Sequence, residues 1–298
     1  MSAVPMQLSD NGFAATGVVA QGYAYSTPWR IVVAALTAVS AAGMLLIFLL
    51  VLFSNDPPVT PDLLFRLVAL LALLPAGVAL WIRRASVATI EVDHLTIAVT
   101  RRGFRLEVPS QAIDAVVPWI VPLPGPGFSL RMRSGRRLRY GIETAEAAAV
   151  LRALAEIADV AVAAPAARHP SVIYAAAKSA SCPHGWVHAG CKFVLFALLP
   201  AAVLFNAHQH IAYGGTLGEY YLLGWQSYAA TFLIYWTTTA IYLVLYAGMW
   251  RAAAEAVSLA VAWLASAYAA PARRVVESIC RVAYYGGVPL LLLIRFLP

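Results

Sequence analysis

Two pairs of long apolar runs dominate the pattern of hydrophobic and polar positions along the chain. Residues 31–53 and 62–82 form the first pair, and residues 191–211 and 225–250 form the second. Because about 20 apolar residues suffice for a helix to cross the hydrocarbon core of a bilayer, each run is predicted to be a transmembrane helix. The pattern therefore predicts two transmembrane hairpins.

Between the two pairs, the pattern changes to short runs of the kind found in β-strands. Three runs rich in β-branched residues come first, at residues 87–92, 95–100 and 104–108. Residues 130–133 then alternate apolar and basic side chains, and a Ser-Gly turn and a second run, 136–142, follow, which predicts a β-hairpin. Residues 144–158 place apolar side chains on one helical face behind Thr144, a suitable N-cap. We therefore expect a small sheet closed by one helix.

The boundaries of these patterns divide the chain into six parts. They are an N-terminal segment (1–29), a transmembrane hairpin (30–84), a β-rich domain (85–160), a linker (161–190), a second transmembrane hairpin (191–250) and a C-terminal part (251–298). Within the last part, residues 252–270 are apolar but carry Glu255, which favours a helix lying in the membrane interface. Residues 282–297 form a short apolar run that gives a fifth span across a thin bilayer. The predicted fold class is an α+β membrane protein with four or five transmembrane helices.

Composition and charge support this interpretation and orient the chain. Hydrophobic residues make up 61% of the 298 residues and charged residues only 12%, against about 25% charged in soluble domains. The connections at 54–61 and 212–224 contain no Lys or Arg, whereas basic residues gather at the opposite ends of the spans, at Arg83, Arg84, Lys192, Arg251, Arg273, Arg274 and Arg281. The positive-inside rule then predicts that the N-terminus and the β-rich domain are cytoplasmic.

Residues 31–160 resemble bacterial membrane proteins in which a bacterial pleckstrin-homology (PH) domain follows two spans. The resemblance rests on residues 88–92 (Ala-Thr-Ile-Glu-Val), 95–97, 105–109, Ile113, Val116 and 129–137 (Ser-Leu-Arg-Met-Arg-Ser-Gly-Arg-Arg), with the helix predicted at 144–158. It implies a PH-like β-barrel capped by a C-terminal helix, at the bacterial inner membrane, with a binding or scaffolding role. It implies no catalytic residues, and it does not include the C-terminal spans.

The predicted hairpin carries the first candidate site, which consists of four arginines: Arg131, Arg133, Arg137 and Arg139. Because alternate residues of a strand share a face, these side chains are expected to stand together. Like charges opposite one another destabilise a hairpin, and an anionic lipid headgroup or an acidic protein surface would relieve the repulsion. The alternative is a solvated face whose counter-charges are Glu91, Glu107 or Glu143. Nucleic acid is disfavoured because the stretch has no stacking aromatics beyond Phe128 and Tyr140.

A second candidate site is a set of possible metal ligands at the outer end of the third span. His208 and His210 lie two residues apart, so they converge only on a strand-like or irregular backbone, and Glu219 is a possible third ligand. This pattern is the basis of an alternative function, a membrane-embedded enzyme that binds a metal ion or heme. The default interpretation is a polar loop at the membrane interface, where histidine is easily accommodated.

A third and less favoured candidate precedes the third span and combines cysteine with histidine: Cys182, His184, His188 and Cys191. On a helix, His184, His188 and Cys191 share one face, and imidazole and thiolate are suitable zinc ligands. Zinc sites, however, usually draw their ligands from two elements, and the glycines at 185 and 190 weaken a helix here. Simple packing near the interface is the alternative interpretation.

These patterns favour a membrane-anchored binding or assembly protein, a scaffold, over an enzyme. Its expected partners are membrane lipid and other membrane protein subunits, it is not expected to bind nucleic acid, and it is expected to need no cofactor. The chain contains no phosphate-binding Gly-Lys-Ser/Thr loop and no Gly-x-Ser-x-Gly sequence. No pair of carboxylates lies inside a predicted span, which argues against a proton-coupled transporter.

Overall fold

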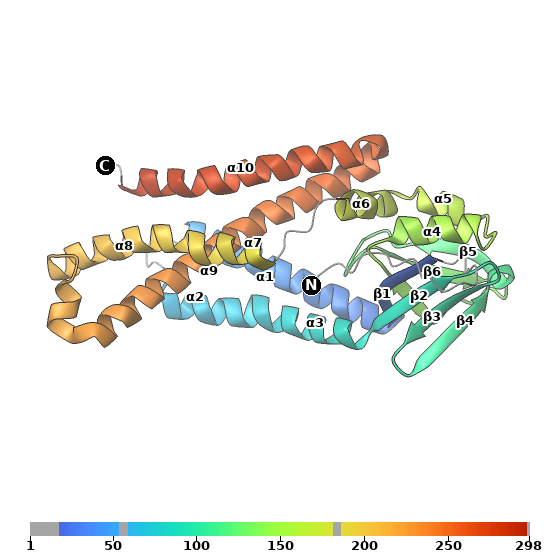
Figure 1. The fold of residues 1–298 in the computed structure, drawn as a ribbon, viewed down its shortest axis with the longest axis horizontal. Coiled ribbons are helices and arrows are strands. Elements are labelled where there is room, and N and C mark those ends of the chain that lie inside the picture. The colour runs from blue at the N-terminus through green and yellow to red at the C-terminus, as the bar shows by residue number, and fades with distance from the viewer. Residues whose placement is uncertain (1–17, 54–58, 181–185, 297–298) are drawn as a thin grey trace, which may run out of the picture.

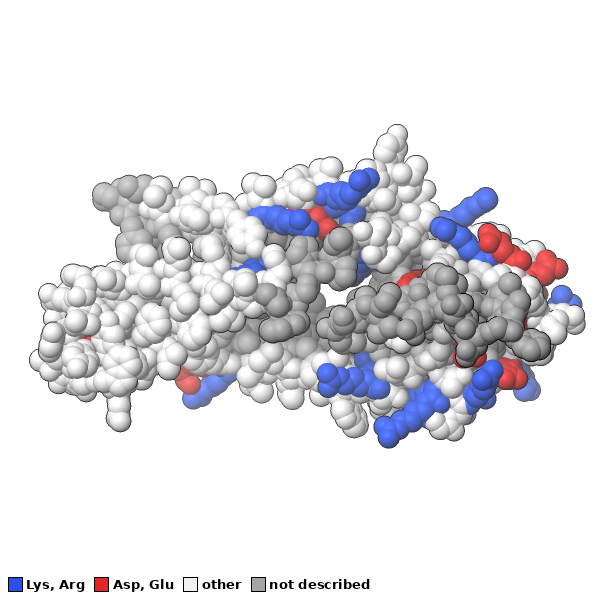
Figure 2. Space-filling model, viewed as in Figure 1, with Lys and Arg blue, Asp and Glu red and all other residues white. Residues whose placement is uncertain are grey.

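The structure, a computed structural model, describes residues 18–53, 59–180 and 186–296. It has two parts that lie end to end (Figure 1). One is a curled β-sheet with short helices packed against it, and the other is a group of long helices that extends away from one edge of the sheet. Figure 2 shows charged side chains gathered over the sheet and the helix ends beside it, whereas the far part of the helices carries few of them on this face.

The described residues form one antiparallel sheet of seven strands, in the order β4-β3-β2-β1-β7-β6-β5. The strands are β1 Val18–Ser26, β2 Val87–Val92, β3 Thr96–Arg101, β4 Phe104–Pro109, β5 Ile113–Pro118, β6 Gly127–Met132 and β7 Tyr140–Glu143. The sheet curls into a half-barrel, so that the Phe104 ring of β4 stacks on the Tyr140 ring of β7, with 5.1 Å between their centroids. Inward-facing residues of the strands, such as Ile90, Val99 and Leu130, form the core.

Short helices pack on this core (Figure 1): α4 Ala147–Glu156, α5 Ala163–Ala167 and α6 Pro170–Ser179. Helix α4 buries Val150, Leu151 and Leu154, which are the apolar face expected from the sequence. It begins at Ala147 rather than at residue 144. The reason is that the Thr144 hydroxyl donates a hydrogen bond to the carbonyl oxygen of Gln21, at 3.0 Å, and so ties this part of the chain to β1.

The central strand β1 departs most from the sequence-based prediction, which places residues 1–29 in a segment outside the domain. In the structure, Val18–Ser26 pairs with both β2 and β7. The strand buries Ala20 and Ala24 on the core side. Small residues bury little apolar area, so this run carries a weak hydrophobic signal of its own. Its place in the sheet is decided by partner strands that lie far along the chain.

The helical part begins with α1 Thr27–Phe53, followed by a continuous helix made of α2 Pro61–Leu67, the π-helical η1 Val68–Leu73 and α3 Leu74–Ala85. A second pair contains α7 Trp186–Gly190, the π-helical η3 Cys191–Leu195, α8 Phe196–Tyr213 and α9 Gly218–Leu264, and α10 Ala269–Phe296 ends the described chain. Short 3-10 helices lie at η2 Ser110–Ala112 and η4 Ser266–Tyr268. Among the described residues, four helices are long and apolar enough to cross a membrane: Thr27–Phe53, Pro61–Ala85, His188–Tyr213 and Gly218–Leu264.

The number and order of the C-terminal helices differ from the prediction. Residues 252–264 continue α9 instead of forming a separate interfacial helix. The described part of the run predicted as a final span, residues 282–296, lies in α10, which returns along α9 (Figure 1). Helix α9 can continue because the charge of Glu255 is paired with basic side chains of α6, α9 and α10. Within α9, the chain changes direction at Gly224, whose φ of 84° glycine adopts without steric strain.

Residues 161–180 are folded, although the sequence predicts a linker at 161–190. Helices α5 and α6 place Ala163, Ala166 and Val172 in the core of the sheet domain. Runs of alanine and proline contribute little to a hydrophobic pattern and therefore look like a linker in the sequence. Their small side chains nevertheless let a helix lie close to the sheet, which is a property of packing rather than of periodicity.

The first two long helices approach each other closely at Gly43 of α1. A Cβ atom there would lie 2.5 Å from the carbonyl oxygen of Leu71. We expect Gly43→Ala to lower the free energy of unfolding by about 1–3 kcal/mol, because the backbones must move apart. The matched variant Gly77→Ala, which has open space around it, should be neutral or slightly stabilising. Thermal unfolding of the two purified variants in the same detergent measures the difference, and equal melting temperatures would contradict the close approach.

Candidate functional site

The edge of the sheet that faces the long helices carries the arginines singled out from the sequence. Strand β1 ends at Ser26 and runs directly into α1, and β2 begins at Val87 just after α3. The register places Tyr140 of β7 opposite Ser26 and Arg101 of β3 opposite Ala88. The turns β3–β4 and β6–β7 therefore lie beside the strand ends that join the helices. We call this side of the sheet the helix-proximal edge, and it comprises Ser26, Val87, residues 101–104 and residues 131–140.

The predicted hairpin is present, but its turn covers residues 133–135 rather than Ser134 and Gly135 alone, and β7 begins at Tyr140 rather than at residue 136. Gly135 has a φ of 77°, a left-handed conformation that suits glycine in a tight turn. Arg131 stands directly opposite Arg137 in the hairpin. The four arginines of the candidate site are all exposed: Arg131, Arg133, Arg137 and Arg139. The hairpin thus gathers like charges at the helix-proximal edge.

The counter-charges considered from the sequence pair with other residues. Glu91 and Glu107 contact Arg105, with N to O distances of 3.4 and 2.8 Å. Glu143 contacts Arg83. Because all three carboxylates are engaged in this way, they do not neutralise the hairpin.

A carboxylate that sequence reasoning missed, Asp114 of β5, pairs with Arg131. The distance from Arg131 Nε to Asp114 Oδ2 is 2.8 Å. Only the register of β5 against β6, which is shifted by an irregularity between Ile113 and Ala115, brings the two side chains together. Among the described residues, no carboxylate forms an ion pair with Arg133, Arg137 or Arg139.

The β6–β7 turn reaches the beginning of α1. Arg137 lies close enough to Arg30, in the first turn of α1, for the two guanidinium charges to repel each other. Arg30 in turn lies over the ring of Trp119, 4.6 Å from its centroid. Trp119 packs in one cluster with Val33 of α1 and Ile82 of α3. The basic turn is therefore at the level where the long apolar helices begin.

The β3–β4 turn adds positive charge to the same edge. Arg101 donates hydrogen bonds to the carbonyl oxygens of Ala85, at the end of α3, and of Ala24, at 2.9 and 3.4 Å. These bonds tie β3 to the junction between sheet and helices. Arg102 and Arg84 are exposed beside it.

A buried ion pair joins the sheet to the first helical pair. Arg83 of α3 donates to Glu143 of β7 at 2.6 Å, and its guanidinium lies 4.7 Å from the centroid of the Tyr23 ring. The Glu143 residue is only 3% exposed. Burial raises the pKa of Glu143, and the positive charge of Arg83 acts in the opposite direction. The position of the sheet on the helices thus depends on a carboxylate that one arginine neutralises.

The predicted histidine ligands do not come together, because they lie on a regular helix. His208 and His210 both belong to α8, where residues two apart leave the helix in different directions. The His208 ring lies against Tyr213 and Tyr235, and His210 Nδ1 is hydrogen-bonded to the carbonyl oxygen of Asn206 at 3.0 Å.

The proposed third ligand, Glu219, is buried and already bound by neutral donors. Its carboxylate accepts hydrogen bonds from Gln209 at 2.6 Å, from Ser227 at 2.8 Å and from Thr231 at 2.7 Å. The Gln209 side chain also accepts a bond from the backbone N–H of Glu219, at 3.2 Å. These bonds hold the turn between α8 and α9. Within the described ranges, no group of three or more His, Cys, Asp or Glu residues is placed to hold a metal ion.

Half of the cysteine–histidine candidate is outside the described residues, namely Cys182 and His184. His188 lies in the short helix α7, and Cys191 begins η3, where its thiol is free and exposed. The structure thus places two of the four residues and leaves the set of four as a prediction.

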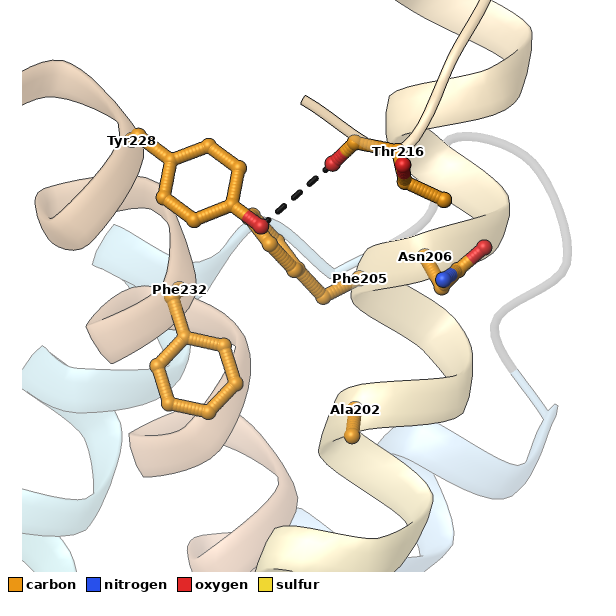
Figure 3. Close-up of a pocket in the computed structure, with 6 residues that line it drawn as sticks. All are labelled: Ala202, Phe205, Asn206, Thr216, Tyr228 and Phe232. Carbon is orange, nitrogen blue, oxygen red and sulfur yellow. Dashed lines mark hydrogen bonds between the residues drawn. The ribbon is translucent and has the colours of Figure 1, made fainter. Parts of the chain in front are cut away.

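A pocket of about 340 Å³ lies between α8 and α9, near the turn that joins them (Figure 3). It is lined by Ala202, Phe205, Asn206, Thr216, Tyr228 and Phe232. The Tyr228 hydroxyl donates to the carbonyl oxygen of Thr216 at 3.3 Å across one side. Half of the lining residues are aromatic, and the residues singled out from the sequence are not among them.

A polar cluster that sequence reasoning missed joins α6, α9 and α10. At its centre, Glu255 contacts four donors: Tyr174, Lys178, Arg251 and Arg273. Arg273 is 1% exposed and also contacts Glu277 at 2.7 Å. Burial by itself lowers the pKa of Arg273, but the hydrogen bonds to Glu255 and Glu277 raise it. The only signal in the sequence is Glu255 itself, an acidic residue in an otherwise apolar stretch.

The chain matches no known protein-family model, no curated protein and no solved structure. Its function therefore has to be argued from the geometry of the helix-proximal edge and of the helices beside it.

Proposed function

We propose that this chain is an integral protein of the bacterial inner membrane that binds anionic lipid headgroups through the helix-proximal edge of its sheet domain. One observation carries the proposal. The exposed arginines of the β6–β7 turn lie beside Arg30, where α1 begins. In a protein built in this way, the helices anchor the sheet domain and hold its basic edge against the membrane surface.

The surface of the long helices supports insertion into a bilayer. Large apolar side chains point outward along them, and Leu70, Trp81 and Leu222 are 63%, 72% and 71% exposed. Apolar surface in water is unfavourable by about 25 cal/mol per Å², and a lipid environment removes this cost. Basic residues gather at the sheet end of the helices, so the positive-inside rule puts the sheet domain in the cytoplasm.

The geometry favours lipid over an acidic protein as the anionic partner. Helices α1 and α3 leave the sheet at the same edge that carries the arginines, so headgroups are the anions nearest to them. A basic side chain near an anionic membrane surface contributes on the order of 1 kcal/mol, and the effect decays within a Debye length. Arg133, Arg137 and Arg139 are available for this interaction, whereas Arg131 shares its charge with Asp114.

The shape of the domain is compatible with the PH-like fold that the resemblance implies. A curled antiparallel half-barrel is closed by α4, whose apolar face lies in the core of the sheet. The departure is that the central strand comes from residues before the first long helix. A PH-like scaffold interrupted by a helical hairpin would fix its binding edge relative to the bilayer, which a flexible tether cannot do.

Removing the charge of the hairpin tests the proposal. The native cysteines are replaced by serine, and a fluorophore is attached to the cysteine introduced by Ser134→Cys. The labelled protein is reconstituted into phosphatidylcholine nanodiscs that contain a headgroup quencher and increasing amounts of phosphatidylglycerol. We expect quenching to rise with phosphatidylglycerol and to fall at high salt. With Arg131, Arg133, Arg137 and Arg139 all changed to Gln, the loss of about 3 kcal/mol of attraction should reduce this dependence to the small part that Arg84 and Arg102 retain.

Two controls separate charge from folding. The four-fold Arg→Lys variant should retain the response, and Arg152→Gln with Arg168→Gln, two exposed positions on the helical layer, should leave it unchanged. An unchanged response in the four-fold Gln variant would overturn the proposal. Salt-sensitive co-purification of an acidic protein, lost in the same variant without any lipid response, would instead identify a protein as the partner.

A further inference from the structure

Three basic side chains from three helical segments come together beside the second helical pair. Lys192 lies in η3, Arg251 in α9 and Arg281 in α10. The Lys192 ammonium is 4.0 Å from the centroid of the Tyr284 ring, and Tyr284 lies one turn beyond Arg281 on α10. The two guanidinium groups are near enough to repel the Lys192 ammonium.

A hydrogen bond between the helices supports this placement. The Cys280 thiol, next to Arg281, donates to the carbonyl oxygen of Trp250, next to Arg251, at 3.5 Å. Helices α9 and α10 are thus in contact at the level of both arginines. The three positive charges therefore come from three helical segments that lie close together at this level.

The carboxylates in this region do not balance its positive charge. Three of its five basic side chains, Lys192, Arg251 and Arg281, are the group described above, and the other two are Lys178 and Arg273. Among the described residues, the carboxylates that pair with them are Glu255 and Glu277, and Glu255 is shared by three. Neither Lys192 nor Arg281 forms an ion pair with a described carboxylate. Like charges held together in a partly desolvated place favour an external anion.

We infer that Lys192, Arg251 and Arg281 bind the phosphate group of an anionic phospholipid at the surface of the second helical pair. Arg251 and Arg281 are exposed and Lys192 is half-buried, so one phosphate can be approached from all three helices. Guanidinium and ammonium groups are the usual protein ligands of phosphate oxygens.

The apolar surface beside the cluster distinguishes a lipid from free phosphate. Leu195, one turn after Lys192, and Val282, the neighbour of Arg281 in the chain, are 59% and 74% exposed. Acyl chains would cover these side chains, and inorganic phosphate would not. The site rests on the proposed membrane insertion, but it does not depend on the basic edge of the sheet, which belongs to the first helical pair.

The test uses the full chain in detergent, with the four-fold Arg→Gln hairpin variant as the background, so that lipid binding at the helix-proximal edge is weakened. Short-chain phosphatidylglycerol and phosphatidylcholine are titrated, and bound lipid is counted by native mass spectrometry. We expect this background to keep a phosphatidylglycerol site. Adding Lys192→Gln and Arg281→Gln should weaken it about 25-fold, at roughly fivefold for each charge near an anionic group.

Each outcome bears on the inference. The double variant Lys192→Arg/Arg281→Lys keeps both positive charges, and the control Arg152→Gln/Arg168→Gln loses two charges elsewhere. Retained phosphatidylglycerol binding in both would support the inference. A background variant that binds phosphatidylglycerol no better than phosphatidylcholine would overturn it, whatever the hairpin experiment gives. If inorganic phosphate displaces the lipid, and binds in the absence of lipid with the same affinity as phosphatidylglycerol, the cluster is a phosphate site. That result would also overturn the inference.

Discussion

Replacing Arg83 by methionine is expected to lower the free energy of unfolding by about 3–5 kcal/mol, because it leaves the buried carboxylate of Glu143 without its cation. The two groups are 2.6 Å apart, and the Glu143 residue is 3% exposed. Methionine keeps most of the apolar stem of the arginine, so the loss reports mainly the charge. Denaturant unfolding of the purified protein in detergent, followed by tryptophan fluorescence, measures it.

The neighbouring residue provides the control. Arg84 is exposed at the end of the same helix, and Arg84→Met should change stability by less than about 0.5 kcal/mol. Equal effects of the two substitutions would mean that the ion pair does not hold the sheet on α3.

The defect of the Arg83 variant should depend on pH, and its sign follows from Glu143. Burial raises the pKa of this carboxyl, so the folded chain binds the proton more tightly than the unfolded chain does. Such a group destabilises the fold increasingly as the pH rises from the unfolded pKa to the folded pKa. Without Arg83 the folded pKa rises further, so the difference between variant and native protein should narrow as the pH is lowered from neutral to about 5. If the difference in free energy of unfolding between the variant and the native protein does not depend on pH, the lost stability comes from packing of Arg83 against Tyr23 rather than from the charge of Glu143.

Replacing Glu255 by leucine is expected to cost about 3 kcal/mol or more, because it leaves basic side chains of three helices close together without their shared carboxylate. Arg273, which is 1% exposed, would keep only Glu277 as a partner. The expected structural consequence is loss of the contact between α6 and the α9–α10 pair. The free energy of unfolding of Glu255→Leu, measured by the same denaturation in detergent, tests this.

A double-mutant cycle with Arg273→Met isolates the interaction. We expect a coupling energy of about 1–3 kcal/mol between Glu255 and Arg273, since they are joined by two hydrogen bonds at 2.8 and 3.1 Å. The pair Asp62–Arg66 is the control, with side chains 73% and 72% exposed, and Asp62→Asn should change stability by no more than about 0.5 kcal/mol. A coupling energy near zero for Glu255 and Arg273 would contradict the central role of this carboxylate.

Much of the candidate site could be predicted from local pattern. The alternation of residues 130–133 and the Ser134-Gly135 turn predict a hairpin whose arginines share an edge, because strand period and turn chemistry are local properties. Which carboxylates accompany those arginines could not be predicted in this way. Asp114 reaches Arg131 through a strand register with an irregularity, and Glu143 is drawn to Arg83 by the docking of the sheet on α3.

The amino-acid sequence by itself determines the long apolar helices, the hairpin with its basic turn and the apolar face of α4, because length, period and turn residues act over a few neighbouring positions. Only the tertiary structure decides that Val18–Ser26 is the central strand, that α9 continues past Glu255, and that Lys192, Arg251 and Arg281 lie together. Each of these features depends on partners distant in the chain. A short strand, a buried carboxylate or a cluster of cations is stable only when packing brings its counterpart into contact, and no local pattern records that contact.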